Sequence, residues 1–316
     1  MSQTHAPAPT ALVRGDEVAP ETLHAAFIRA FSDYLIGPFQ VPIAQWPIFL
    51  ARQGVDLPLS RVALDAAGAP LAFAFVAPRP LSGRWRLATM GATPAARGSG
   101  AAPALLDDVV ARAAASGLRA VELEVFAQND RARRLYEGRG FTRIHDLFGY
   151  LAEPRTLTRD EGTDSPGVPE VAEAIDAPKA VTLSQALAWL DAVERRLPDL
   201  PLQVTAATLR HGQDYLAWQL GQGGLSGRDG EIGGDGDGEA RAQVVFSLPD
   251  ETVLLHSLIA PRDADARALL RALATAYPDR RVRVPQLQRE DLGGAALRAL
   301  GAAPQPLHQQ LMVRAL

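Results

Sequence analysis

Residues 92–102 read Ala-Thr-Pro-Ala-Ala-Arg-Gly-Ser-Gly-Ala-Ala, and they join a predicted strand to a long predicted helix. The first amide groups of a helix have no partner inside the helix, and the helix dipole attracts anions to that end. Glycines at 98 and 100 allow the backbone to approach a phosphate without an intervening Cβ. The segment therefore predicts a pyrophosphate site, the alternative being a simple tight turn. It is not the dinucleotide fingerprint, whose third glycine would fall at Pro103.

Downstream of this helix, the residues predict a strand, a second helix and another strand. Apolar and acidic residues alternate over 121–125, which places Glu122 and Glu124 on the same face of a strand. Asn129 precedes the second helix and can cap it, while Tyr136 lies within it. Gly140-Phe141 then begins the closing strand.

In these residues the sequence resembles the GCN5-related N-acetyltransferase (GNAT) family. The family's acetyl-CoA loop, Q/R-x-x-G-x-G/A, is matched by Arg97, Gly100 and Ala102. Its strand–Asn–helix–Tyr–Gly-Phe signature is matched between Glu124 and Phe141, and the resemblance covers residues 20–151. It implies an α/β fold (an α+β mixed sheet), mostly antiparallel and flanked by helices. The two central parallel strands of that sheet splay apart, and acetyl-CoA lies in the gap.

The resemblance also implies the site residues. Tyr136 would lie near the coenzyme sulfur and donate to it, its alternative role being a packing residue. Glu124 would take the acceptor's proton directly or through water, and the alternatives for this base are Glu122 and a bound water. The residues expected to bind acetyl-CoA are Met90, Gly91, Ala92, Arg97, Gly98, Ser99, Gly100, Ala101, Ala102 and Asn129.

Composition excludes several other classes of protein. The chain has 316 residues, 47% of them hydrophobic, which is enough for two domains with buried cores. Zero cysteines exclude disulfides, thiolate nucleophiles and cysteine-ligated metals. The single lysine, Lys179, has no glycine loop before it, which argues against a P-loop nucleotide site and a pyridoxal enzyme.

Charge and hydropathy bear on partners and location. The net charge of −4 gives no basic excess for nucleic acid or an anionic membrane. No apolar run approaches 20 residues and no signal peptide is evident, so we expect a cytoplasmic protein. The six histidines have no metal-site spacing, and no bound metal is expected. Asp235, Asp237 and Glu239 loosely resemble a calcium loop, but the glycine-rich run around them favours a flexible loop.

The two halves are predicted to repeat one order of elements. Expected helices are 21–34, one within 43–50, 98–116, 130–138, 183–196, 264–277 and 292–300. Expected strands are 61–64, 71–77, 85–92, 120–125, 141–151, 202–210, 215–220, 242–248, 253–259, 282–284 and 307–313. Residues 1–20 are expected to be frayed. The predicted domains are an N-terminal GNAT domain (1–153), a linker (154–178) and a degenerate GNAT-like domain (179–316) with a flexible loop at 221–239.

The second half lacks the motif residues of the first. Leu297 stands in the place of Tyr136, and Glu290 stands in the place of Asn129. The loop at 261–266 has no glycine and two added carboxylates, which would repel an anion. We therefore expect the second domain not to bind acetyl-CoA, but to pack as a pseudo-dimer partner and to wall part of the acceptor cleft. The assembly expected is a monomer by pseudo-dimer fusion or a homodimer.

These features predict an N-acetyltransferase that transfers acetyl directly, in a ternary complex, to a primary amine. The acceptor is a small molecule or a peptide, and its specificity is expected to lie in the helices between 26 and 53. Residues 79–86 are interpreted as a solvated basic turn, or else as a feature that favours an acidic acceptor. The alternative function is a non-catalytic, acyl-CoA-binding regulatory or scaffold protein.

Overall fold

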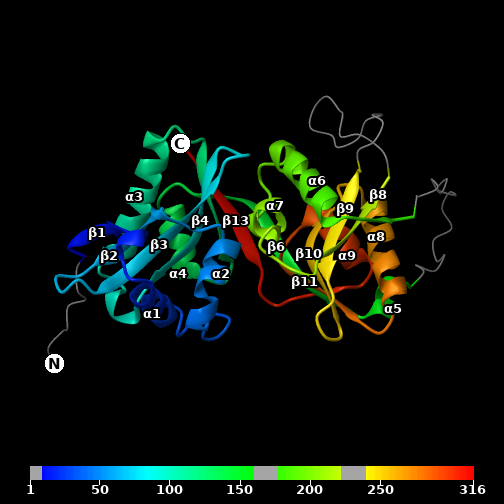
Figure 1. Cartoon of the computed structure of the whole chain (residues 1–316), viewed down its shortest axis with the longest axis horizontal. Coiled ribbons are helices and arrows are strands. Elements are labelled where there is room, and N and C mark those ends of the chain that lie inside the picture. Colours follow the sequence, from blue (N-terminus) through cyan, green and yellow to red (C-terminus); the bar gives the residue numbers. More distant parts are fainter. Residues whose placement is uncertain (1–8, 160–176, 222–239) are drawn as a thin grey trace. The chain divides into compact units, whose positions relative to one another are not determined.

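The computed structural model describes residues 9–159, 177–221 and 240–316, and these form two compact units (Figure 1). Unit 1 contains the chain up to Ile144 together with Leu311–Leu316, and unit 2 contains His145–Gln310. This division does not coincide with the expected boundaries at 153 and 179. Residues 145–153 belong with unit 2, and the last six residues of the chain belong with unit 1.

The expected linker and loop lie mainly outside the described residues. Of the linker at 154–178, residues 160–176 are not described, and its first residues form α5 (Pro154–Leu157). Leu157 is fully buried in the core of unit 2, so this segment is part of a folded unit. Residues 222–239, which include the loosely calcium-like stretch, also lie outside the described residues.

Unit 1 contains one mixed sheet. Its strands, in spatial order, are β1 (Ala11–Arg14), β2 (Asp56–Leu64), β3 (Pro70–Arg79), β4 (Arg84–Ala92), β5 (Ala120–Phe126) and β13 (Gln309–Ala315). The strands β1 to β4 pair antiparallel, and β4 and β5 pair parallel. The end of β13 is held in unit 1, because the Leu316 amide donates to the Arg119 carbonyl and Met312 is buried in the unit's core.

Alternation along β3 divides the core of unit 1 into two layers. Phe73 and Phe75 pack against α1 (Pro20–Ala30) and α2 (Trp46–Arg52). The intervening residues pack with the apolar side of α3 (Ala101–Ala115) and with residues of α4 (Asp130–Glu137). Helices therefore cover both faces of the sheet (Figure 1).

The two parallel strands of unit 1 separate soon after they meet. β4 and β5 are in register only at Arg84–Ala120, Trp85–Val121 and Arg86–Glu122 within the described residues. β4 continues to Ala92 with β3 on its other edge. One edge of its last residues is therefore left without a neighbouring strand, which confirms the expected pair of splayed parallel strands.

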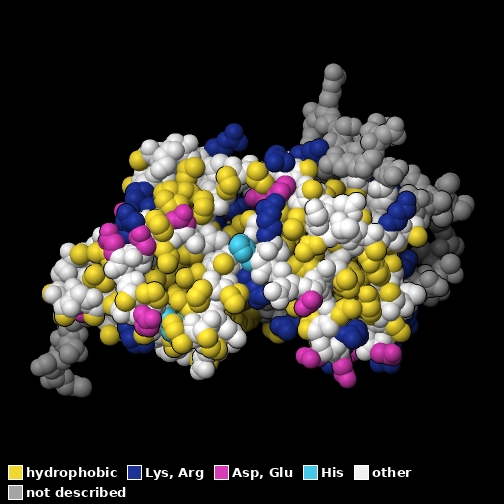
Figure 2. Space-filling model, viewed as in Figure 1, with side chains coloured by type: hydrophobic (Ala, Val, Ile, Leu, Met, Phe, Trp, Pro, Cys, Tyr) yellow, Lys and Arg dark blue, Asp and Glu magenta, His cyan; other side chains and the backbone are white. Residues whose placement is uncertain are grey.

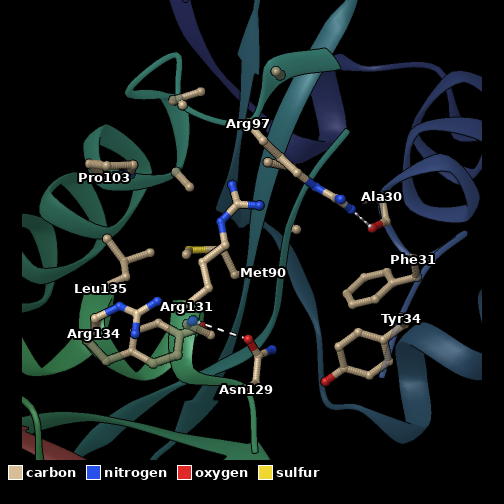
Figure 3. A pocket seen from close by; sticks show the side chains of 18 of the residues that line it. Ala30, Phe31, Tyr34, Met90, Arg97, Pro103, Asn129, Arg131, Arg134 and Leu135 are labelled. Atoms are coloured by element: carbon tan, nitrogen blue, oxygen red, sulfur yellow. Dashed lines mark hydrogen bonds between the residues drawn. The ribbon is translucent and has the colours of Figure 1, made fainter. Parts of the chain in front are cut away.

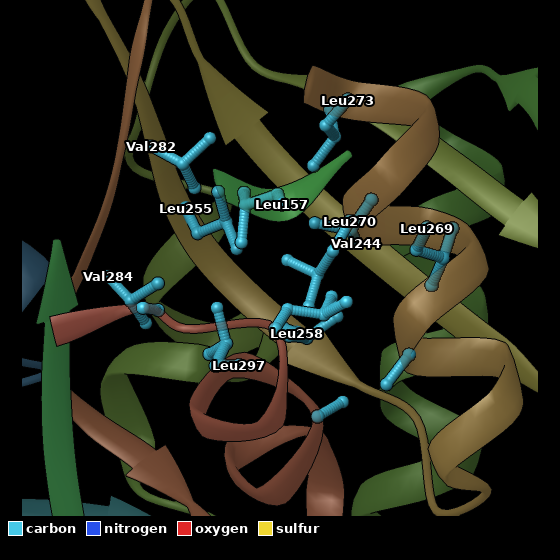
Figure 4. Close-up of a cluster of buried hydrophobic side chains, with 14 of the residues drawn as sticks. Leu157, Val244, Leu255, Leu258, Leu269, Leu270, Leu273, Val282, Val284 and Leu297 are labelled. Carbon is cyan, nitrogen blue, oxygen red and sulfur yellow. The ribbon is translucent and has the colours of Figure 1, made fainter. Parts of the chain in front are cut away.

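Unit 2 repeats this architecture. Its strands, in spatial order, are β6 (Thr142–Ala152), β11 (Arg281–Arg289), β10 (Thr252–Ile259), β9 (Ala242–Ser247), β8 (Leu216–Leu220) and β7 (Lys179–Val181), with β12 (Ala303–Pro304) beside β6. β10 and β11 are parallel and pair over only three residues. Its helices include α6 (Leu183–Arg196), α8 (Asp263–Ala276) and α9 (Gly294–Ala299). Figure 4 shows leucines of α8 and Leu297 of α9 packed with the valines and leucines of these strands.

Two of the expected elements are wrong. Residues 11–14, expected to be frayed, form β1 by pairing with β2. Residues 202–210, expected to be a strand, form a 3-10 turn (Leu202–Val204) and α7 (Ala206–Leu209). The buried residues Leu202, Ala206 and Leu209 have the i, i+4, i+7 spacing of a helix, and this periodicity prevails over their strand propensity. The other 3-10 turns are Gly15–Glu17, Ile43–Gln45, Pro94–Ala96 and Glu290–Leu292.

Charges on the surface are mixed in sign. On the face drawn in Figure 2, basic and acidic side chains are interspersed over each unit, as the net charge of −4 suggests. Among the residues that the structure describes, no helix combines the length and the apolar composition needed to span a membrane.

Candidate active site

A cavity of about 780 Å³ opens in unit 1 beside the last residues of β4 (Figure 3). It is bounded by the end of α1, the loop before α3 and the first two turns of α4. The predicted site residues that line it are Met90, Gly91, Ala92, Arg97, Gly98, Gly100, Ala101, Ala102, Asn129 and Tyr136. Ser99 and Glu124 are the two predicted site residues that do not line it.

The loop before α3 has the properties of an anion site. Gly98 and Gly100 have φ of +84° and +86°, and a Cβ built on either would meet open space. Within the described residues, the amides of Gly98, Gly100 and Ala102 have no hydrogen-bond partner. Ser99 does not line the cavity, and its hydroxyl accepts a hydrogen bond from the Ala101 amide at 3.3 Å. Unpartnered amides at the positive end of a 15-residue helix fit a phosphate group.

The end of β4 forms a second wall, in which Gly91 is fixed by packing. A Cβ at this position would lie 2.9 Å from Cζ of Phe73 and 3.0 Å from the Ala30 methyl. Only glycine therefore fits between β3 and α1 without a shift of its neighbours. The unpaired edge of β4 here can accept an extended chain as an added strand would.

Helix α4 supplies Asn129 and Tyr136. The Asn129 side chain caps the helix by accepting from the Ala132 amide at 3.2 Å, which confirms the expected cap. The Tyr136 side chain is 93% buried, and its ring packs against Phe141 at 5.9 Å between centroids. Burial, and to a smaller degree the neighbouring Tyr34, raises the pKa of Tyr136 well above its ordinary value. The hydroxyl therefore remains protonated and can donate a hydrogen bond.

The Arg97 side chain does not extend into the cavity as a free cation. Its two terminal nitrogens donate to the two carboxylate oxygens of Asp33, and Nη2 also donates to the Ala30 carbonyl at 3.4 Å. This hydrogen-bonded pair lowers the pKa of Asp33 and raises that of Arg97. Arg97 thus connects the loop before α3 to the end of α1.

The two candidate carboxylates of β5 form ion pairs with arginines. Glu122 is fully buried and pairs with Arg79 and, at 3.2 Å, with Arg84. Glu124 pairs with Nη2 of Arg86 at 2.6 Å, and its Oε1 is buried without a hydrogen-bond partner in the described part of the chain. Because neither carboxylate lines the cavity, the geometry gives no support to either as a base that touches the acceptor.

The same ion pairs correct the interpretation of residues 79–86 as a solvated basic turn. Arg79 and Arg86 are 1% and 2% exposed. Both are held inside unit 1 by the β5 carboxylates, so their charge is compensated there and is not offered to solvent or to an acidic acceptor.

Several lining residues were not expected from sequence. Phe31, Tyr34 and Leu35 follow α1 and form the wall opposite α4, as Figure 3 shows for Phe31 and Tyr34. Arg131 and Arg134 project from α4. The spacing of these arginines beside Asn129 was visible in the sequence, whereas no local pattern could indicate that the end of α1 faces them.

The corresponding place in unit 2 is filled by protein groups. At the start of α8, the fully buried Asp265 carboxylate accepts from Nε of Arg241 at 2.9 Å. Where β10 and β11 separate, the Gln288 amide donates to the carbonyls of Leu258 and Leu292 at 3.2 and 2.9 Å. A carboxylate thus lies at the start of α8, and a side-chain amide bridges the opening between the strands. Leu297 lies in the core.

Splayed parallel strands with a helix start facing the gap are the α/β arrangement that the resemblance to the GNAT family implies. Residues 23–141 match the model of the Acetyltransferase (GNAT) family. A search of curated proteins finds no match to the chain.

Solved structures extend the similarity in fold to the whole chain. A GCN5-related N-acetyltransferase from Sphaerobacter thermophilus superposes with a TM-score of 0.55 at 15% identity, covering 98% of this chain and 96% of that one. Those from Kribbella flavida and Anabaena variabilis ATCC 29413 give TM-scores of 0.58 at 15% and 12% identity. They cover 97% and 96% of this chain, and 71% and 72% of their own. At these identities the likeness concerns the fold.

The described residues contain no group of three or more side chains arranged to hold a metal ion. The polar groups of the cavity lining include backbone amides, arginines, Gln128, Asn129 and tyrosine hydroxyls, together with the paired carboxylate of Asp33 and the exposed one of Asp130.

Proposed function

We propose that unit 1 transfers the acetyl group of acetyl-CoA directly to a primary amine in a ternary complex. The observation that carries this proposal is one cavity that holds both unpartnered amides at a helix start and a buried, protonated tyrosine. A phosphate site alone would suit many nucleotides. The tyrosine near an unpaired strand edge adds a hydrogen-bond donor where a thioester can lie.

The residues present fit the coenzyme. The amides of Gly98, Gly100 and Ala102 would hold the diphosphate, with no Cβ in the way at the two glycines. The edge of β4 at 90–92 would pair with the amide groups of the pantetheine arm. Both features line one cavity, so a single extended ligand can engage them together.

In the proposed reaction the lone pair of a neutral amine attacks the thioester carbonyl carbon. The C–S bond breaks with its electron pair on sulfur, the nitrogen loses one proton and the sulfur gains one. The products are the acetylated amide and the free coenzyme thiol. Holding both reactants in one cavity supplies much of the rate enhancement, because it removes the entropic cost of their encounter from the chemical step.

Tyr136 is proposed to donate a hydrogen bond to the sulfur as negative charge develops there. With its pKa raised by burial, it is a weaker acid than a thiol of pKa about 8.5. Complete proton transfer from the tyrosine would therefore be uphill. The proton that ends on sulfur comes from water or from the acceptor nitrogen, and Tyr136 stabilises the transition state electrostatically.

We propose water as the group that takes the acceptor's proton. Both glutamates of β5 are buried against arginines. Asp33 is bound by Arg97, and Asp130 is exposed beside Arg133. None of these carboxylates is placed as a free base in the cavity, so the acceptor must react from its neutral, deprotonated fraction.

The acceptor is proposed to lie against the wall of Phe31, Tyr34 and Leu35. These residues give an apolar and aromatic surface with one hydroxyl, opposite the helix that carries Tyr136. A small-molecule amine or a peptide amine both suit such a wall. We propose that unit 2 is a degenerate copy that does not bind acetyl-CoA, in keeping with Asp265 and Gln288 in the corresponding places.

The test is Tyr136→Phe, assayed by thiol release with a panel of amines. We expect kcat to fall about 10- to 100-fold, the value of one hydrogen bond to a developing charge, while calorimetric affinity for CoA is unchanged. Tyr150→Phe is the matched control, because Tyr150 is also buried but its hydroxyl lies in unit 2 beside Glu290. A wild-type protein that binds acetyl-CoA and acetylates no amine would instead support the non-catalytic binding protein.

A further inference from the structure

Two arginines of α4 line the cavity without a hydrogen bond or an ion pair to another described residue. Arg131 is the second residue of the helix and Arg134 lies one turn later, on the same side. Both side chains are exposed, and neither has an ion pair or hydrogen bond within the described residues. Figure 3 shows Arg131 extending from α4 into the middle of the cavity, between the helix and the loop that carries Arg97.

The neighbouring arginines differ in this respect. Arg133, between the two, pairs with Glu137 at 3.2 Å and does not line the cavity. Arg139 pairs with Asp107 at 2.7 Å. The outward side of α4 therefore has its charges compensated, while the side facing the cavity does not.

The position of Arg131 is electrostatically unfavourable in the free protein. The first turn of a helix carries the positive end of its dipole, which favours acidic residues and disfavours cations. Two described carboxylates line the cavity, and both have arginine partners. Asp33 is bound by both terminal nitrogens of Arg97, and Asp130 pairs with Arg133 at 3.4 Å. An anionic ligand would relieve this excess of positive charge.

We propose that Arg131 and Arg134 select the acyl carrier by binding phosphate groups of coenzyme A. This inference rests on the proposed function. The amides of the loop before α3 would approach the phosphates from one side, and the two guanidinium groups from the other. The site would therefore accept acyl groups carried on the phosphorylated nucleotide and discriminate against the same acyl group on phosphate-free pantetheine.

The experiment titrates three probes into the full chain: CoA, dephospho-CoA and pantetheine. Arg131→Ala and Arg134→Ala are each expected to weaken CoA binding about tenfold or more, the value of a charge-assisted hydrogen bond. Pantetheine affinity should not change, because it has no phosphate. Arg131→Lys should restore part of the lost affinity, and Arg133→Ala should leave all three affinities unchanged.

Titration with dephospho-CoA shows which phosphate of the coenzyme each of the two arginines binds. The arginine that binds the 3′-phosphate should lose its effect with this probe, and an arginine that binds the diphosphate should retain it. Added salt should weaken CoA binding to the wild type more steeply than to either alanine variant, since exposed charges are screened.

The proposal is overturned if both alanine variants bind CoA as the wild type does, or if pantetheine affinity falls by the same factor as CoA affinity. Binding of CoA by the wild type that depends on the arginines, without acetylation of any amine, would refute the proposed catalysis and leave this inference standing. Acetylation of an amine that is unchanged in both alanine variants would refute this inference and leave the proposed catalysis standing.

Discussion

Arg97 holds the carboxylate of Asp33 through both of its terminal nitrogens. The pair connects the loop that begins α3 to the segment after α1, and these are two walls of one cavity. Under the proposed function, Arg97 would link the coenzyme side of the cavity to the acceptor side. Direct contact with phosphate would then fall to the backbone amides and to the arginines of α4.

Asp33→Asn should loosen this link. The pair is partly exposed, so we expect little change in the free energy of unfolding. The KM for acetyl-CoA should nevertheless rise several-fold, because the loop is no longer tied to α1. Steady-state kinetics with a urea titration check both parts, and Glu137→Gln, which breaks an exposed pair outside the cavity, is the control. An unchanged KM would contradict the role given to the pair.

Gly100→Ala should impair binding more than stability. A left-handed conformation costs an alanine about 1–2 kcal/mol, and the added methyl points into the open space where a phosphate would lie. Gly68→Ala is a matched control, since Gly68 has φ of +79°, an equally open surrounding, and a position outside the cavity. We expect similar losses of stability in the two variants and a loss of CoA affinity of about tenfold or more only at Gly100. Equal affinities would show that the loop does not hold the coenzyme.

The pH dependence of kcat/KM should be set by the acceptor. With no free carboxylate in the cavity, the rising limb follows the pKa of the amine. Because burial raises the pKa of Tyr136, its hydroxyl keeps its proton at and above pH 10, the ordinary pKa of tyrosine, and no falling limb is expected below about that pH. Two amines whose pKa values differ by about two units should give limbs displaced by that difference.

A rising limb of kcat/KM at the same pH for both amines, which disappears in Glu124→Gln, would contradict this account. It would show that the Oε1 of Glu124, which has no hydrogen-bond partner among the described residues, acts on the acceptor through water, one of the two routes that the sequence predicts for this residue. Tyr136→Phe should leave the rising limb in place, since the tyrosine is not the group that titrates there.

Met312→Ala should destabilise unit 1 although the residue lies near the end of the chain. Met312 is 1% exposed in the core of unit 1, and removal of such a side chain costs about 2–5 kcal/mol. Limited proteolysis over a urea series should then cleave unit 1 at lower urea than in the wild type. Leu316→Ala, at a position 41% exposed, is the control and should change little. Earlier cleavage of unit 2 alone would contradict the assignment of β13 to unit 1.

Local sequence signals predicted part of the lining of the cavity. The glycines at 98 and 100, the Asn129 cap and the helix with Tyr136 each follow from backbone chemistry within a few residues, and the structure brings them together. The fold class was predicted from the resemblance of residues 20–151 to the GNAT family, and the periodicity of the sequence indicated most of the strands and helices.

Contacts between residues distant in sequence could not be predicted. Alternation gives the face of the strand on which Glu124 lies, but it cannot show that Arg86 lies on the same face and pairs with it. Likewise, the pairing of Arg97 with Asp33, 64 residues earlier, depends on where α1 ends relative to the loop. The placement of Leu311–Leu316 in unit 1 has no signature in those residues themselves.

The most direct test of the central claim is amide hydrogen exchange of the full chain with and without saturating CoA. The amides of Gly98, Gly100 and Ala102 have no partner in the described part of the free protein and should exchange quickly. We expect CoA to slow exchange at 98–102 and at 129–136, and to leave the start of α8 at 263–266 unaffected. No slowed segment in unit 1, or slowing at 263–266 in its place, would contradict the account.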